Sequence, residues 1–243
     1  MVPAYNESAT VAEVIGALHR HAPQFDVVVV DDGSTDDTGR IAERAGAPVL
    51  RLPFNLGIGG AVQAGFSYAL DNGYERMIQV DADGQHMPEE MMVLTDAMDQ
   101  DPTIDMVCGS RFLTDKGYPA PVSRRTGIHI FAFLLSRIVG QRVSDPTSGF
   151  RLYNRRGIAL FAGDYPHDYP EVEAVLMVHH HRLRMIEVPV RMRERDGGVS
   201  SISSGKSAYY MLKVSLAIFV GLARRRPVPE PGGEAPVAAG HGI

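Results

Sequence analysis

The chain has 243 residues, 44% hydrophobic and 22% charged, so it can bury a full core, and its single cysteine excludes both a disulfide framework and a cysteine-based zinc site. The net charge of −5 divides unevenly, because residues 1–112 carry 6 Lys and Arg against 18 Asp and Glu, whereas residues 113–243 carry 18 against 11. An acidic first half suits a bound cation, a basic second half suits an anionic substrate or a membrane surface, and we expect no nucleic-acid partner.

Strand and helix patterns alternate through the first 110 residues. Short β-branched or apolar runs predict strands, and apolar residues that recur every three or four positions predict helices between them. The expected strands lie at 25–30, 48–52, 75–80 and 104–108, and the expected helices at 11–18, 41–45, 60–70 and from 88 onward. Repeated βα units of this kind predict an α/β protein, with a mostly parallel sheet and helices on both faces.

The start of the chain departs from this pattern. A sheet of this kind normally opens on an apolar strand, yet Pro3 follows directly after Met1 and Val2. We therefore expect a shortened first strand and a true start that lies upstream. The first helix should begin at a capping box formed by Thr10 and Glu13. No basic segment opens this end of the chain, so no signal peptide is expected.

The second half is less regular. Residues 128–139 are apolar on nearly every face, which is typical of a helix that is buried or lies on a membrane. Residues 208–223 are also apolar, but they contain Lys213 and are too few to span a bilayer, which takes about 20 residues. Residues 187–192 predict an edge strand that carries Pro189. The expected domain covers 1–223, with halves at 1–112 and 113–223, and a disordered tail rich in Pro and Gly follows at 224–243.

Two carboxylates, Asp81 and Asp83, follow the strand that is expected to end at Val80. Side chains two residues apart on an extended chain point the same way, so both can reach one cation at the carboxyl edge of the sheet, where open α/β sheets bind ligands. Gln85 can add a neutral oxygen, and such a set suits Mg²⁺ or Mn²⁺. The alternative is a plain acidic turn made flexible by Gly84.

Two other segments are expected at the same edge of the sheet. Asp31 and Asp32 follow the strand at 25–30, and their carboxylates can accept hydrogen bonds from a ribose or a base N–H group. The alternative is an Asp-Gly turn with a helix cap. Residues 55–60 precede a helix and could bring their backbone close to phosphates. Their glycine spacing fails at Val62, however, which favours simple turn chemistry there.

Taken together, five segments in this order resemble glycosyltransferase family 2, which has the GT-A fold. They are Pro3-Ala4-Tyr5-Asn6-Glu7, Val30-Asp31-Asp32-Gly33-Ser34, residues 55–60, Asp81-Ala82-Asp83-Gly84-Gln85-His86 and Gly109-Ser110-Arg111. The resemblance implies a GT-A domain whose first half, 1–112, binds a nucleotide-sugar donor and whose second half, 113–223, binds the acceptor. The implied donor contacts are Pro3, Tyr5, Glu7, Asp31, Asp32, Gly57, Asp81, Arg111, Arg193 and Arg195, and the implied metal ligands are Asp81, Asp83 and Gln85.

The segment Asp145 to Arg151 is similar to the acceptor side of dolichol-phosphate mannose synthases and related polyprenyl-phosphate transferases. In it, Ser148, the backbone at Gly149 and the side chain of Arg151 would form a cradle for an anion, since Arg can pair bidentately with phosphate. The alternative is a tight turn in which Arg151 forms a structural ion pair.

Residues 193–201 resemble the family's loop over the donor diphosphate. Ser201 stands where those synthases often carry Lys, which puts a direct Lys–phosphate contact in doubt. Arg193 or Arg195 is expected to substitute for it.

Three acidic residues are candidates for catalysis: Asp145, Glu171 and Glu173. Transfer to a sugar hydroxyl needs a general base, whereas a phosphate acceptor is already anionic and needs none. Their role therefore depends on the acceptor. The alternative for Glu173 is a helix cap or a salt bridge.

The sequence thus predicts a metal-dependent, inverting glycosyltransferase of the cell envelope. It would move a sugar from a GDP-, UDP- or dTDP-linked donor to polyprenyl phosphate, as a cytoplasmic protein in peripheral contact with the cytoplasmic face of the membrane. The alternative acceptor is a hydroxyl of a surface polysaccharide or lipid-linked glycan. A sugar nucleotidyltransferase would instead need a glycine-rich basic loop where Tyr5-Asn6-Glu7 stands, and a non-catalytic nucleotide-sugar binder would tolerate loss of Asp81 and Asp83.

Overall fold

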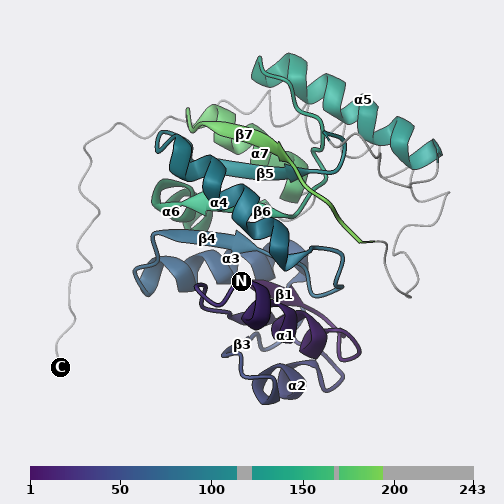
Figure 1. Ribbon diagram of the computed structural model, residues 1–243, viewed down its shortest axis with the longest axis vertical. Coiled ribbons are helices and arrows are strands. Elements are labelled where there is room, and N and C mark those ends of the chain that lie inside the picture. The colour runs from purple at the N-terminus through teal and green to yellow at the C-terminus, as the bar shows by residue number, and fades with distance from the viewer. Residues whose placement is uncertain (114–121, 167–169, 194–243) are drawn as a thin grey trace.

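The computed structural model describes residues 1–113, 122–166 and 170–193 (Figure 1). Its strands are β1 Val2–Ala4, β2 Val29–Asp31, β3 Val49–Arg51, β4 Arg76–Gln79, β5 Met106–Ser110, β6 Arg151–Asn154 and β7 Met185–Pro189. Its helices are α1 Val11–His21, α2 Thr38–Arg44, α3 Gly57–Asp71, α4 Met91–Gln100, α5 Val122–Val139, α6 Arg155–Gly163 and α7 Pro170–His180, with a 3₁₀ turn at Pro88–Glu90. The expected loop contact at Arg195, the apolar segment at 208–223 and the tail lie outside the described residues.

The strands form two sheets that meet edge to edge. One has the order β1-β2-β3 and is parallel; the other has the order β4-β6-β5-β7, in which only β6 runs against its neighbours. Two backbone hydrogen bonds join them, from the Met1 amine to the Ile78 carbonyl at 2.9 Å and from Val80 N–H to the Met1 carbonyl at 3.0 Å. The predicted mostly parallel α/β sheet is confirmed, and β7 lies at an edge as expected.

Helices cover both faces of this arrangement, because side chains alternate along each strand. Met77 and Tyr153 face one core, with Phe66 of α3 and Phe161 of α6, and three of these rings pack with centroids 4.8 to 5.4 Å apart. The neighbouring residues Ile78 and Leu152 face the other core, which α1, α2 and α4 cover. Figure 1 shows the strands stacked between these two helical layers.

Three elements of the second half were not expected from the sequence: β6, α6 and α7. β6 has no apolar alternation at its start, because it opens with Arg151, which is nevertheless only 1% exposed. The capping box was wrong. The Thr10 hydroxyl donates to a Glu7 carboxylate oxygen at 3.1 Å instead of capping α1.

Candidate active site

The loops after β1, β2 and β4 lie at one edge of the sheet, because these strands run in the same direction. Asn6, in the left-handed region with φ 55°, accepts from Thr35 N–H at 2.8 Å, and its own N–H donates to the Ser34 hydroxyl. Glu7 N–H donates to the Thr38 hydroxyl at 2.8 Å. The first expected donor loop is therefore bound to the second.

The two acidic residues of the second loop are both almost fully buried. Asp31 accepts a hydrogen bond from Ser34 N–H at 3.0 Å, and Asp32 accepts one from Leu56 N–H at 2.7 Å. Burial raises the pKa of Asp32, and backbone N–H groups of Leu56 and Gly57 oppose that rise. Gly57 opens α3 with φ 81°, a conformation in which a residue with a side chain would be strained. The two carboxylates therefore hold the backbone of the loops after β2 and before α3 through hydrogen bonds.

The remaining donor candidates of the first loop differ in exposure. Pro3 is buried within β1, Glu7 is half-buried, and the ring of Tyr5 is 44% exposed. Tyr5 therefore has a surface that a planar ligand such as a nucleobase could contact.

The expected metal turn, Asp81–Gln85, directly follows β4. Gly84 has φ 76°, and the turn closes through Gln85 N–H, which donates to Asp83 Oδ1 at 3.0 Å. The Gln85 side-chain amide contacts Asp83 Oδ2, so these two side chains converge. The Asp81 side chain is 37% exposed. The turn therefore offers the carboxylate oxygens of Asp81 and Asp83 and the amide oxygen of Gln85. Oxygen ligands of this kind fit a hard divalent cation.

No group of three or more His, Cys, Asp or Glu side chains is placed to hold a metal among the described residues. At the Asp81–Gln85 turn, the described groups that could ligate a cation are two carboxylates and the Gln85 amide. Ligand oxygens would have to complete its coordination, as in sites where Mg²⁺ is shared with a substrate phosphate.

Arg111 and Asp145 form a bidentate ion pair, with Nε and Nη2 each 2.7 Å from a carboxylate oxygen. Arg111 is 7% exposed and Asp145 is 1% exposed. The backbone N–H of Asp145 donates to Glu187 at 2.9 Å, and the other Glu187 oxygen accepts from both the N–H and the hydroxyl of Ser144. Glu187 was not expected at the site from the sequence, since nothing in its surroundings on β7 marks it as a hydrogen-bond acceptor for a segment 42 residues away.

This ion pair bears on the expected catalytic role of Asp145 and on the expected donor contact of Arg111. Both oxygens of Asp145 are occupied by Arg111, so it is placed as a structural partner and not as a base open to substrate. Arg111 also donates to the Thr147 hydroxyl at 2.9 Å. Arg111, which was expected to contact the donor, therefore also holds the expected acceptor segment in place through Asp145 and Thr147.

The acceptor segment lies directly against the metal turn. A Cβ atom added at Gly149 would lie 3.3 Å from both carboxylate oxygens of Asp81 and 3.1 Å from the Gln79 amide. A Cβ atom here would press on these side chains, so glycine favours the close approach of the two segments. Ser148 is 2% exposed, and its hydroxyl accepts from Phe150 N–H. Gly149 is thus the point at which the two expected half-sites meet.

Arg151 occupies the interior of the protein. Its guanidinium donates to the carbonyls of Ser148 at 2.7 Å, Pro146 at 3.4 Å and Glu171 at 2.7 Å, and its Nη1 has no hydrogen-bond partner. It therefore ties the acceptor segment to α7. The expected direct contact of this guanidinium with an acceptor anion does not match its 1% exposure. The alternative of a structural role fits better, with carbonyls in place of an ion pair.

Glu171 and Glu173 both lie in the first turn of α7 and are half-buried. Burial raises the pKa of Glu171, the positive charge of Arg151 opposes this, and the negative charge of Asp81 adds to it. Glu171 is therefore close enough to the metal turn to sense its charge. Arg193, which is exposed, joins the turn through its backbone N–H, which donates to the Gln85 carbonyl at 2.9 Å.

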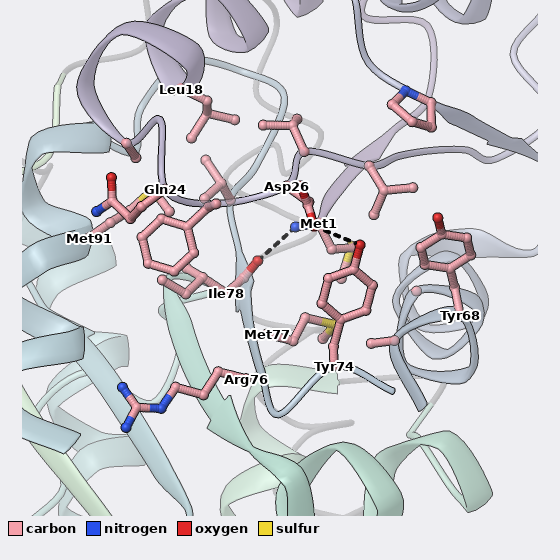
Figure 2. A pocket seen from close by; sticks show the side chains of 18 of the residues that line it. Met1, Leu18, Gln24, Asp26, Tyr68, Tyr74, Arg76, Met77, Ile78 and Met91 are labelled. Atoms are coloured by element: carbon pink, nitrogen blue, oxygen red, sulfur yellow. Dashed lines mark hydrogen bonds between the residues drawn. The ribbon is translucent and has the colours of Figure 1, made fainter. Parts of the chain in front are cut away.

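A cavity of about 720 Å³ lies elsewhere, at the opposite ends of the strands (Figure 2). Its lining includes Met1, Leu18, Tyr74, Arg76 and Met77. The figure shows the Met1 amine directed at the Ile78 carbonyl inside it. None of the expected site residues lines this cavity, so we assign the chemistry to the carboxyl edge of the sheet.

No helix in the described part of the chain is both long enough and apolar enough to cross a membrane.

Comparison with known proteins identifies the family of the chain. The chain matches the family model described as glycosyl transferase family 2 over residues 1–160. It is 32% identical over 228 residues to the polyprenol monophosphomannose synthase of Mycolicibacterium smegmatis, covering 88% of this chain and 84% of that protein. It is 35% identical over 215 residues to the undecaprenyl-phosphate mannosyltransferase of Micrococcus luteus, covering 84% and 87%.

Among solved structures, it resembles the glucosyl-3-phosphoglycerate synthase of Mycobacterium tuberculosis in complex with Mn²⁺, UDP and glucosyl-3-phosphoglycerate. The TM-score is 0.66 at 19% identity, over 95% of this chain and 80% of that one. This likeness concerns the fold alone, and it confirms the expected architecture.

Proposed function

Because the chain belongs to glycosyl transferase family 2 and is a glycosyltransferase of the GT-A fold, we propose that it transfers a sugar from a nucleotide sugar to polyprenyl phosphate. Two relatives that it matches over most of their length are named for transfer to a polyprenyl or undecaprenyl phosphate. One observation carries the proposal in this chain: the backbone at Gly149, in the acceptor segment, packs against the carboxylate of Asp81. Donor and acceptor can therefore meet there.

In this proposal, residues 1–112 bind the donor and residues 113–223 bind the acceptor. Asp81, Asp83 and Gln85 would hold Mg²⁺ or Mn²⁺, and the cation when bound would neutralise the diphosphate leaving group. The exposed ring of Tyr5 and the loops organised by Asp31 and Asp32 would receive the nucleoside. Attack from the side of Gly149, opposite the leaving group, would invert the anomeric carbon.

The protein groups around the acceptor segment favour a phosphate over a hydroxyl. A hydroxyl acceptor needs a base, and the Asp145 carboxylate is engaged by Arg111 at 2.7 Å through two contacts. A phosphate acceptor is already negatively charged and needs no base. It would bind beside the backbone of Gly149, which lies against the Asp81 carboxylate.

Transfer to a hydroxyl remains the second candidate because of one residue, Glu171. Its pKa is raised by burial, and it is close enough to the metal turn for the Asp81 charge to affect it. A carboxylate with a raised pKa is a better proton acceptor at neutral pH than an ordinary one. If Glu171 is the base, E171Q should abolish transfer; if the acceptor is a phosphate, E171Q should retain most activity.

We also propose contact with the cytoplasmic face of the membrane through α5. Phe133 and Ile130 on this helix are 63% and 49% exposed, and the guanidinium of Arg137 lies 5.6 Å from the Phe133 ring centre. Exposed apolar side chains beside a cation are typical of a helix that lies in the membrane interface. Figure 1 shows α5 at the periphery of the molecule.

The decisive experiment incubates the full chain with GDP-, UDP- and dTDP-linked sugars and Mn²⁺, with and without polyprenyl phosphate, and identifies products by mass spectrometry. We expect a sugar-linked polyprenyl phosphate and release of nucleoside diphosphate, both lost in D81N and on addition of EDTA. R40Q, at an exposed arginine on α2, serves as a matched control that should keep activity. Product only with a hydroxyl acceptor would reject the first candidate, and no product with any donor would reject both.

A further inference from the structure

His86 contacts Asp81 through both of its ring nitrogens. The backbone N–H of Asp81 donates to Nδ1 at 3.0 Å, and Nε2 lies 3.7 Å from Asp81 Oδ2. Because Nδ1 accepts this hydrogen bond, it carries no proton, so the neutral ring is protonated at Nε2, on the side of the carboxylate. The side chain is only 6% exposed, so the contacts are shielded from water.

The same ring packs against the acceptor segment. It stacks on Phe150 with centroids 4.8 Å apart and planes 24° apart, and Phe150 is fully buried. Phe150 follows Gly149, whose backbone lies against the Asp81 carboxylate. His86 also forms an isolated antiparallel bridge with Met192. The imidazole therefore contacts the Asp81 turn and the acceptor segment, and the backbone of the same residue pairs with Met192.

We infer that His86 is a positioning residue that orients the Asp81 carboxylate and holds the segment around Gly149 against it. This inference rests on the proposed metal site, and it assigns His86 no contact with the cation or the substrates. Two independent contacts set the surroundings of Asp81. The hydrogen bond to Nδ1 holds the Asp81 backbone, and the stacking on Phe150 holds Gly149 beside the Asp81 carboxylate. Groups that orient a metal ligand typically change metal affinity about 10- to 100-fold when they are removed.

Two substitutions separate these contacts. H86F keeps a ring to stack on Phe150 but has no acceptor for Asp81 N–H. H86N places an amide oxygen close to the position of Nδ1 but has no ring. The affinity for Mn²⁺ alone is measured on the full chain by electron paramagnetic resonance of the free ion, with circular dichroism to verify folding.

We expect H86F to bind Mn²⁺ about 10- to 100-fold more weakly than the unsubstituted chain, and H86N to recover most of that loss. Equal affinity of H86F and the unsubstituted chain would overturn the inference. A loss in H86N as large as that in H86F would also count against it, since the hydrogen bond would then not matter.

A second measurement needs no metal. Nitrogen-15 NMR of the unsubstituted chain should show the neutral Nε2–H form of His86 and a scalar coupling between Asp81 N and His86 Nδ1 across their hydrogen bond. A proton on Nδ1, or no coupling, would overturn the inference. A chain that shows the coupling but binds no Mn²⁺ would instead refute the proposed metal site while the orienting contact stands.

Discussion

In a chain that begins at Met1, the α-amino group of this residue is built into the sheet, and this makes stability depend on pH. It donates to the Ile78 carbonyl at 2.9 Å, and burial lowers its pKa from 8.0 to about 5. Between these two values the unfolded chain binds a proton that the folded chain does not. The free energy of unfolding therefore falls as pH decreases from 8, and the contribution is lost near pH 5.

The size of this effect follows from the shift. Each pKa unit corresponds to about 1.4 kcal/mol, so the whole shift corresponds to about 4 kcal/mol, of which about 2.3 kcal/mol falls between pH 8 and pH 6 because the unfolded group is half protonated at pH 8. Adding Met-Gly-Ser before Met1 replaces the ammonium with a peptide N–H that can still donate to Ile78. The adjoining cavity of about 720 Å³ (Figure 2) gives the added residues room.

Urea unfolding followed by circular dichroism at pH 6, 7 and 8 measures the difference. The extended chain should lose about 2.3 kcal/mol less than the original between pH 8 and pH 6, because other titrating groups are common to both. A chain with the same residues added after Ile243 is the control and should behave as the original. Parallel curves for the original and the extended chain would refute the assignment of this pH dependence to Met1.

Three further predictions concern the site. D145N should lower the free energy of unfolding by about 3 kcal/mol in urea titrations, because it leaves the buried Arg111 without its charged partner; lost transfer with unchanged stability would favour a direct role in catalysis instead. G149A should preserve the fold but weaken Mn²⁺ binding, since its Cβ would press on Asp81, and an unchanged dissociation constant would contradict this close approach. F133S should reduce sedimentation with anionic vesicles several-fold at unchanged circular dichroism, and equal sedimentation would remove α5 from the proposed membrane contact.

The first half of the site could be predicted because its signals are local. Short β-branched or apolar runs end just before Asp31 and Asp81, and parallel strands bring their carboxyl ends together whatever the details of packing. The order of these turns along the chain was therefore enough to place them at one edge. Each turn also carries its own glycine, Gly33 or Gly84, in the left-handed region that the turn requires.

The second half could not be predicted in the same way, because its contacts join residues far apart in sequence. Arg111 and Asp145 are 34 residues apart, and Ser144 and Glu187 are 43 apart. Neither spacing follows from a helical or strand period. The expected contact of Arg151 with an acceptor anion does not match the structure, for a related reason. A cationic side chain is normally exposed, whereas Arg151 lies in the interior at the start of β6.

The burial of Arg151 has an electrostatic consequence for the metal turn. The buried guanidinium is held by backbone carbonyls, and among the described residues no carboxylate accepts a hydrogen bond from it. Its positive charge opposes the burial-driven rise in the pKa of Glu171, whose carboxyl group also senses Asp81. Arg111, by contrast, is neutralised by Asp145. The acceptor side thus has one cation that is paired with a carboxylate and one that is bound mainly by backbone carbonyls, and the charge of the second would favour an anionic acceptor.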